Sequence, residues 1–179
     1  STPRGDIIMA TLVTGATGFI GSHIVRKLVQ RGERVKILLR KTSKTLNIEN
    51  INVERVYGDI MDIESVKKAL EGCDTVYHTA GFVSFRKSDY KKMEEINVKG
   101  TANVLSAALE AGVKKAVYTS SVAAIGVDPK GGITNEETPF TLEDEGIQYL
   151  NTKHYAEREA LKLYEKGLPV VIVNPSVVI

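Results

Sequence analysis

The chain has 179 residues, of which 42% are hydrophobic and 26% charged, and its formal net charge is +2. This composition is typical of a globular protein and contains no apolar run long enough to span a membrane. Because the charges of both signs are interspersed, there is no basic stripe to bind nucleic acid. The length predicts one domain with a sizeable core. The single cysteine, Cys73, has no disulfide partner and no metal-ligand spacing around it, which indicates a reducing, cytoplasmic location.

Short β-branched runs alternate with longer amphipathic stretches along the chain. This alternation predicts an α/β protein with a doubly wound parallel sheet. The predicted strands are residues 7–13, 35–39, 51–57, 75–78, 116–120 and 170–173. Apolar stripes predict helices that end at Gly32, Gly72, Gly112 and Gly167, and residues 126–146 are predicted to form a loop. Residues 1–8 are interpreted as a tag or disordered start ahead of a domain covering 9–179, with Met9 as the native start.

A glycine-rich turn with the sequence TGATGFIG follows the first predicted strand and opens a helix. Gly15 permits the tight turn, Gly18 lets the backbone approach a pyrophosphate, and Gly21 allows close packing of helix on strand. The N-terminus of the helix supplies amide donors and a partial positive charge. The turn therefore predicts a bound dinucleotide, and the alternative is a glycine loop that serves packing alone.

The second predicted strand ends in Arg40, where a cofactor without a 2′-phosphate would need an acidic residue. Lys41 and Ser43 follow instead. A guanidinium with a neighbouring ammonium and hydroxyl suits a phosphate, so the segment favours NADP (NADPH), with NAD as the alternative. Solvated charges at a strand end are the other interpretation.

Tyr149 and Lys153 lie four residues apart on a predicted helix, about thirty residues after the run Thr119-Ser120-Ser121. At this spacing they share a helical face, so the ammonium can stabilise a phenolate. Chance alone supplies roughly 0.6 such matches in a chain of this composition. Thr119 and Ser121 share one strand face, which makes Ser120 the weaker candidate.

Taken together, these motifs resemble the extended branch of the short-chain dehydrogenase/reductase family, within the NAD-dependent epimerase/dehydratase superfamily. The likeness covers residues 11–179, and its motifs arrive in family order. Besides the glycine loop, they are Gly58-Asp59-Ile60, His78-Thr79-Ala80-Gly81, Asn97 in NVKGT, Thr119-Ser120-Ser121, Tyr149, Lys153 and Asn174-Pro175-Ser176. The resemblance implies a Rossmann fold.

The resemblance also implies roles for individual residues. Tyr149 would exchange a proton with the substrate oxygen, Ser121 would hydrogen-bond the same oxygen, and Lys153 would support Tyr149. Asn97 would steady Lys153 through water or kink its own helix. The expected cofactor-binding residues are Gly15, Thr17, Gly18, Phe19, Ile20, Gly21, Arg40, Lys41, Ser43, Asp59, Ile60, Thr79, Ala80, Gly81, Thr119, Tyr149, Lys153, Pro175 and Val178.

His78 and His154 have no partners at metal-ligand spacing, so no metal site is expected. We interpret His78 as a buried strand residue and His154 as a helix-surface residue.

The segment after the serines distinguishes branches of the family. Val122-Ala123-Ala124 stands where dehydratases place an acidic pair, and Ala124-Ile125-Gly126 stands where sugar epimerases commonly have Val-Tyr-Gly. With these two branches disfavoured, the chain is similar to the dihydroflavonol-reductase-like group, which reduces ketones or aldehydes with NADPH. The alternatives are a nucleotide-sugar epimerase with tightly bound NAD and a non-catalytic cofactor-binding protein or inactive fragment.

The resemblance implies further residues after the sixth strand, in a small substrate-binding domain. We therefore expect the 179 residues to be a fragment that lacks this C-terminal domain. The expected partner is a small-molecule carbonyl or alcohol, seated near residues 82–88 and 127–145. A homodimer through the helices around residues 98–109 and 149–163 is a further expectation.

Overall fold

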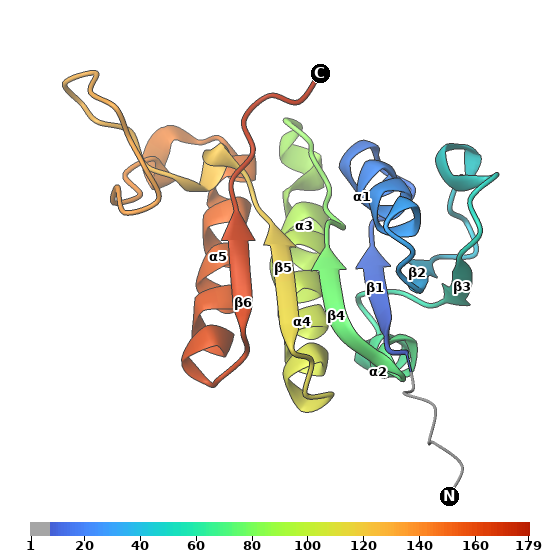
Figure 1. Cartoon of the computed structure of the whole chain (residues 1–179). Coiled ribbons are helices and arrows are strands. Elements are labelled where there is room, and N and C mark those ends of the chain that lie inside the picture. The colour runs from blue at the N-terminus through green and yellow to red at the C-terminus, as the bar shows by residue number, and fades with distance from the viewer. Residues whose placement is uncertain (1–7) are drawn as a thin grey trace, which may run out of the picture.

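The structure is a computed structural model that describes residues 8–179. Except for Ile8, the predicted tag or disordered start therefore lies outside the described residues. A single six-stranded sheet runs through the described part of the chain, with helices on both of its faces (Figure 1). The strands are β1 (Ala10–Thr14), β2 (Val35–Leu39), β3 (Glu54–Tyr57), β4 (Cys73–His78), β5 (Lys115–Thr119) and β6 (Val170–Val173). The α-helices are α1 (Phe19–Gln30), α2 (Ile63–Leu70), α3 (Tyr90–Met93), α4 (Gly100–Glu110) and α5 (Gln148–Glu165).

All strand pairs are parallel, and the strand order is β3-β2-β1-β4-β5-β6. This is the order of a doubly wound dinucleotide-binding sheet, so the predicted fold class is confirmed. The direction of winding reverses between β1 and β4. The carboxyl ends of these two strands therefore flank the crevice in which such sheets bind ligands.

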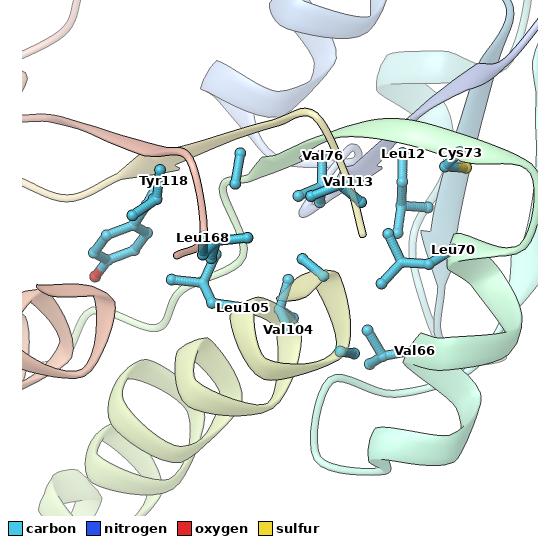
Figure 2. Close-up of a cluster of buried hydrophobic side chains, with 14 of the residues drawn as sticks. Leu12, Val66, Leu70, Cys73, Val76, Val104, Leu105, Val113, Tyr118 and Leu168 are labelled. Atoms are coloured by element: carbon cyan, nitrogen blue, oxygen red, sulfur yellow. The ribbon is translucent and has the colours of Figure 1, made fainter. Parts of the chain in front are cut away.

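The apolar runs of β1 and β2 are buried along their whole length because helices cover both sides of the sheet there. Alternate residues serve two separate cores. Leu12 packs into the core formed with α2, α4 and α5, whereas Val13 packs into the smaller core against α1. Figure 2 shows the larger core, with Tyr118 at one end and its hydroxyl pointing away from the labelled apolar side chains.

Several predicted boundaries were wrong at strand ends. The strand expected over residues 51–57 begins only at Glu54, because Ile51 and Val53 pack under the sheet rather than joining it. The fourth strand begins two residues early, at Cys73, and the fifth covers Lys115–Thr119. The predicted loop 126–146 contains a short 3-10 turn, Glu143–Glu145. The first strand covers Ala10–Thr14 and leaves out Ile8 and Met9, whereas Ile7 of the predicted strand lies outside the described residues.

The half of the sheet formed by β4, β5 and β6 carries a helical layer on one face only, within the described residues. On that covered face, α4 and α5 bury Val76, Ala116 and Tyr118. The opposite face presents apolar side chains, and Val171 and Val173 of β6 are 52% and 40% exposed. The two faces of this half-sheet thus differ sharply in burial.

Candidate active site

A cavity of about 350 Å³ opens at the crevice between the ends of β1 and β4. Its walls come from the glycine loop after β1, the ends of β2 and β3, and residues 79–82 after β4. A cavity in this position is where an open parallel sheet binds its ligand.

The glycine loop approaches the end of β4 more closely than any side chain would allow. Gly15 has a φ of +67°, and a Cβ there would lie 2.5 Å from the Ala80 backbone nitrogen. At Gly21 a Cβ would lie 2.0 Å from the Gly15 carbonyl oxygen and 2.8 Å from Thr79 Oγ1. Gly18 is less constrained, with its nearest contact at 3.3 Å. Gly15 and Gly21 are therefore required for the loop to pack against the segment that follows β4.

The N-terminus of α1 has no side-chain cap. Its N-cap residue is Gly18, and no side chain accepts from the first-turn amides. Amides at a helix start carry a partial positive charge and bind phosphate groups. The loop and helix therefore have the donor chemistry that the pyrophosphate of a dinucleotide requires.

At the end of β2, Arg40 and Ser43 form a tight turn on the cavity wall. The Ser43 amide donates to the Arg40 carbonyl oxygen at 2.9 Å, and the Arg40 amide donates to Ser43 Oγ at 3.1 Å. Both residues line the cavity, whereas Lys41 between them does not. The turn thus brings one guanidinium and one hydroxyl to the cavity and leaves the neighbouring ammonium outside its lining.

The cavity gathers most of the residues predicted for the cofactor. Those on its lining are Gly15, Thr17, Gly18, Arg40, Ser43, Asp59, Ile60, Thr79, Ala80 and Gly81. The sequence reasoning missed Thr14, Ala16, Leu38, Gly58, Phe82, Lys92 and Ile96, which also line it. Lys92 Nζ lies 4.4 Å above the centre of the Phe82 ring. No spacing rule indicated Lys92, because it reaches the wall from a helix remote in sequence.

Other predicted cofactor residues lie elsewhere. Gly21 packs against the loop rather than lining the cavity. Phe19, Ile20 and Val178 line a second, apolar cavity of about 340 Å³ beside α1 and Tyr77. The Pro175 carbonyl oxygen accepts from the Val122 amide at 3.1 Å. Thr119, Tyr149 and Lys153 belong to the neighbouring strand-helix pair β5 and α5, outside the cavity lining.

The acid-base residues come from α5 and the end of β5. Lys153 is buried, and its Nζ donates to Tyr118 Oη and to the Thr119 carbonyl oxygen, each at 3.4 Å. Burial lowers the pKa of Lys153 to about 8, partly offset by the carboxylate of Glu157. The ammonium therefore releases its proton more readily than a surface lysine does.

Ser121 caps the turn that follows β5. Its Oγ accepts a hydrogen bond from the Ala123 amide at 3.0 Å, which leaves the hydroxyl hydrogen free to donate. Ser120 points to the covered face and is buried, as the alternation of strand faces predicts. The Tyr149 ring has an edge contact with Phe85, with ring centres 6.3 Å apart. Ser121 and Tyr149 thus lie on the segments that flank Lys153.

Asn97 hydrogen-bonds directly to Phe82 and Thr152, and its expected contact with Lys153 through water stays a prediction. Its amide accepts from the Phe82 nitrogen at 2.8 Å and donates to the Phe82 carbonyl oxygen at 2.9 Å, and it also donates to Thr152 Oγ1 at 3.2 Å. It lies within a π-helical segment, Glu94–Lys99, between α3 and α4. Such segments mark an irregularity in a helix, which accords with the alternative expectation of a kink.

The two histidines differ in environment. His78 is fully buried, as predicted, and its ring nitrogens pair with Thr14 Oγ1 at 2.7 Å and Thr101 Oγ1 at 2.9 Å. Burial lowers its pKa to about 3. His154 was expected on the helix surface but stacks on Phe140 at 4.2 Å and is half-buried. Cys73 is buried, and burial raises the pKa of its thiol.

Residues 8–179 contain neither a metal-ligand cluster nor a helix that could span a membrane. No three His, Cys, Asp or Glu residues there cluster as metal ligands would. Within the same range, none of the helices combines the length and apolar character needed to traverse a bilayer.

Comparison with known proteins gives relatives along most of the chain. Sterol demethylase protein B of Methylococcus capsulatus is 41% identical over 171 residues, covering 96% of this chain and 52% of the relative. A putative dihydroflavonol 4-reductase of Synechocystis is 39% identical over 164 residues, covering 92% and 48% respectively. The chain therefore spans about half the length of the curated relatives it matches.

A solved structure agrees with these relatives. A short-chain dehydrogenase/reductase superfamily protein from Agrobacterium tumefaciens, with bound NAD, is 27% identical and superposes with a TM-score of 0.76. The alignment covers 92% of this chain and 48% of that one. Residues 12–168, which include the glycine loop, Ser121, Tyr149 and Lys153, match the 3-beta hydroxysteroid dehydrogenase/isomerase family. The chain belongs to this family, within the extended short-chain dehydrogenases/reductases and with a dihydroflavonol-reductase-like relative.

Proposed function

We propose that this chain is the cofactor-binding part of an NADP(H)-dependent oxidoreductase that reduces a ketone or aldehyde to an alcohol. The observation that carries the proposal is the burial of Lys153, one helical turn after Tyr149, with only two long hydrogen bonds to neutral oxygens. A buried ammonium that lacks a tight partner is suited to stabilise a phenolate that forms beside it.

The proposed roles follow from what each side chain has available. Tyr149 donates its phenolic proton to the substrate oxygen, and Lys153 stabilises the phenolate that remains. Ser121 donates the hydrogen that its contact with Ala123 leaves free, and so holds the substrate oxygen in place. When bound, the nicotinamide supplies the hydride for the carbonyl carbon.

NADP is proposed rather than NAD because Arg40 and Ser43 share the cavity wall at the end of β2. A guanidinium and a hydroxyl can both donate to a 2′-phosphate. A cytoplasmic location and a homodimer stay predictions from the sequence.

A test of the reaction is NADPH oxidation followed at the nicotinamide absorbance against a panel of aldehydes and ketones. We expect Tyr149→Phe to lower kcat by about 100-fold or more, because the proton donor is lost. Tyr164→Phe, which alters an exposed tyrosine of the same helix, is the matched control and retains turnover. Unaltered turnover in Tyr149→Phe would refute the mechanism. Cofactor binding without turnover of any carbonyl supports the non-catalytic alternative.

A nucleotide-sugar epimerase with tightly bound NAD is the second candidate. It is favoured by the NAD in the related Agrobacterium tumefaciens structure. The two proposals differ in what the purified protein carries. NAD released on denaturation of freshly purified protein supports the epimerase, whereas preferential NADPH binding by cofactor-free protein supports the reductase.

A further inference from the structure

The titratable groups that β4 and β5 place beside Lys153 carry no negative charge. Tyr118 of β5 offers its hydroxyl at 3.4 Å, and His78 of β4 stacks on the Tyr118 ring with centres 5.5 Å apart. Burial lowers the pKa of His78 to about 3 and raises the pKa of Tyr118, so both are neutral at pH 7. Tyr149, from the preceding turn of α5, also acts on Tyr118. None of these groups opposes the cost of burying an ammonium.

One carboxylate acts on this site, and it comes from the next turn of the same helix. Glu157 follows Lys153 at the i, i+4 spacing, which places both on one helical face. Burial lowers the pKa of Lys153, and Glu157 raises it again.

Asn174 hydrogen-bonds to Glu157 and also to Ser121, which follows β5. Asn174, directly after β6, donates through Nδ2 to Glu157 Oε1 and, at 3.0 Å, to the Ser121 carbonyl oxygen. The two hydrogens of one amide group are enough for both bonds. The amide therefore joins α5 to the segment after β5, so the carboxylate is restrained from turning into solvent.

We infer that Glu157 is a positioning residue that keeps Lys153 protonated, and that Asn174 anchors it while tying the same helix to Ser121. The inference deepens the proposed function and rests on it, because the charge matters to catalysis only if Lys153 supports Tyr149. Glu157 touches neither substrate nor cofactor in this role. Its effect passes through the protonation of Lys153.

The direct test is an NMR titration of the chain labelled at the lysine ε-carbons, with the Lys153 resonance assigned by its loss in Lys153→Met. In the unaltered protein we expect the Lys153 midpoint at about 8, because burial lowers the pKa. In Glu157→Gln, which can still accept from Asn174, we expect the midpoint to fall by about one unit because a single negative charge is removed. Glu157→Asp, which keeps the charge, restores part of the shift.

The matched control is Glu159→Gln, which removes the same charge from the same helix at a residue paired with Lys162. It leaves the Lys153 midpoint unchanged. Equal midpoints in Glu157→Gln and the unaltered protein would overturn the inference. If Glu157→Gln does not fold, Asn174→Ala replaces it. Releasing the carboxylate must then lower the midpoint, and an unchanged midpoint again overturns the inference.

A pH profile separates an electrostatic role from a structural one. With Lys153 required as an ammonium, activity falls as pH rises through its pKa, so Glu157→Gln moves the basic limb of kcat/KM to lower pH by the same shift. If Glu157 had a purely structural role, Glu157→Gln would lower activity at every pH and leave the basic limb of kcat/KM at its original pH. The NMR result does not depend on turnover. A shifted midpoint in a protein that reduces no carbonyl therefore counts against the proposed function and not against the effect of Glu157 on Lys153.

Discussion

The two ends of the crevice are built in different ways. At the cofactor end, the decisive features are backbone: the close approach of Gly15 to Ala80 and the uncapped amides at the start of α1. At the acid-base end they are side chains: the buried Lys153 donates to Tyr118, and Glu157 raises its pKa from the next turn of α5. The glycines of the backbone end follow a local spacing along the chain, although their approach to Ala80 also needs the pairing of β1 with β4. A site made of side chains depends on which strands and helices the sheet brings together.

The largest expected effect tests the backbone end. Gly15→Ala places a Cβ 2.5 Å from the Ala80 nitrogen in a left-handed conformation, so we expect loss of cofactor binding and about 3 kcal/mol of destabilisation. Gly32→Ala is the matched control, because Gly32 has a φ of +76° with nothing within 4 Å. We expect Gly32→Ala to lower the free energy of unfolding by only about 1 kcal/mol, the cost of placing alanine in a left-handed conformation. Denaturant unfolding measures the stability of each variant, and NADPH fluorescence titration measures its cofactor affinity. Equal losses of stability and affinity in Gly15→Ala and Gly32→Ala would refute the importance of the close approach.

A smaller effect, dependent on pH, tests the buried side-chain end. His78 has a pKa of about 3 when folded and an ordinary value of 6.5. Between these values the unfolded chain binds the extra proton, so stability is complete above pH 6.5 and declines as pH falls toward 3. The slope from this residue is at most about 1.4 kcal/mol per pH unit.

His78→Gln removes this contribution, although it also disturbs the hydrogen bonds to Thr14 and Thr101. We therefore expect a variant that is less stable at pH 7 but has a flatter loss of stability below pH 6.5, as measured by urea unfolding at a series of pH values. His23→Gln, on the exposed side of α1, serves as the control and keeps the original slope. A slope unaltered in His78→Gln would show that the buried imidazole is not the cause.

The smallest effect concerns cofactor choice at the end of β2. Arg40→Ala removes the guanidinium on the cavity wall, so we expect the ratio of NADPH to NADH affinity to fall by about 10-fold. Lys41→Ala removes the same charge from a side chain outside the cavity lining and changes the ratio less. Isothermal titration with both cofactors measures the ratio. An Arg40→Ala variant with the original ratio would refute the role given to Arg40.

The fold was largely predictable because most of its strands read as short apolar runs between amphipathic helices. Residues 35–39 and 170–173 were predicted to the residue. The strand expected over 51–57 was too long, because Ile51 and Val53 are apolar for packing under the sheet and not for pairing in it. The π-helical segment around Asn97 was not predicted, since its hydrogen bonds to Phe82 join residues fifteen apart.

The amino-acid sequence by itself determined the α/β class, the glycine loop and the Tyr149–Lys153 spacing, because each depends on neighbours within a few residues. Tertiary structure alone decided that Arg40 and not Lys41 lines the cavity, and that Lys92 joins it. It also brought Asn174 to Glu157 and Ser121. The physical reason is that parallel pairing of β5 with β6 places the ends of two strands distant in sequence side by side. Only that pairing lets the Asn174 amide reach both Ser121 and Glu157.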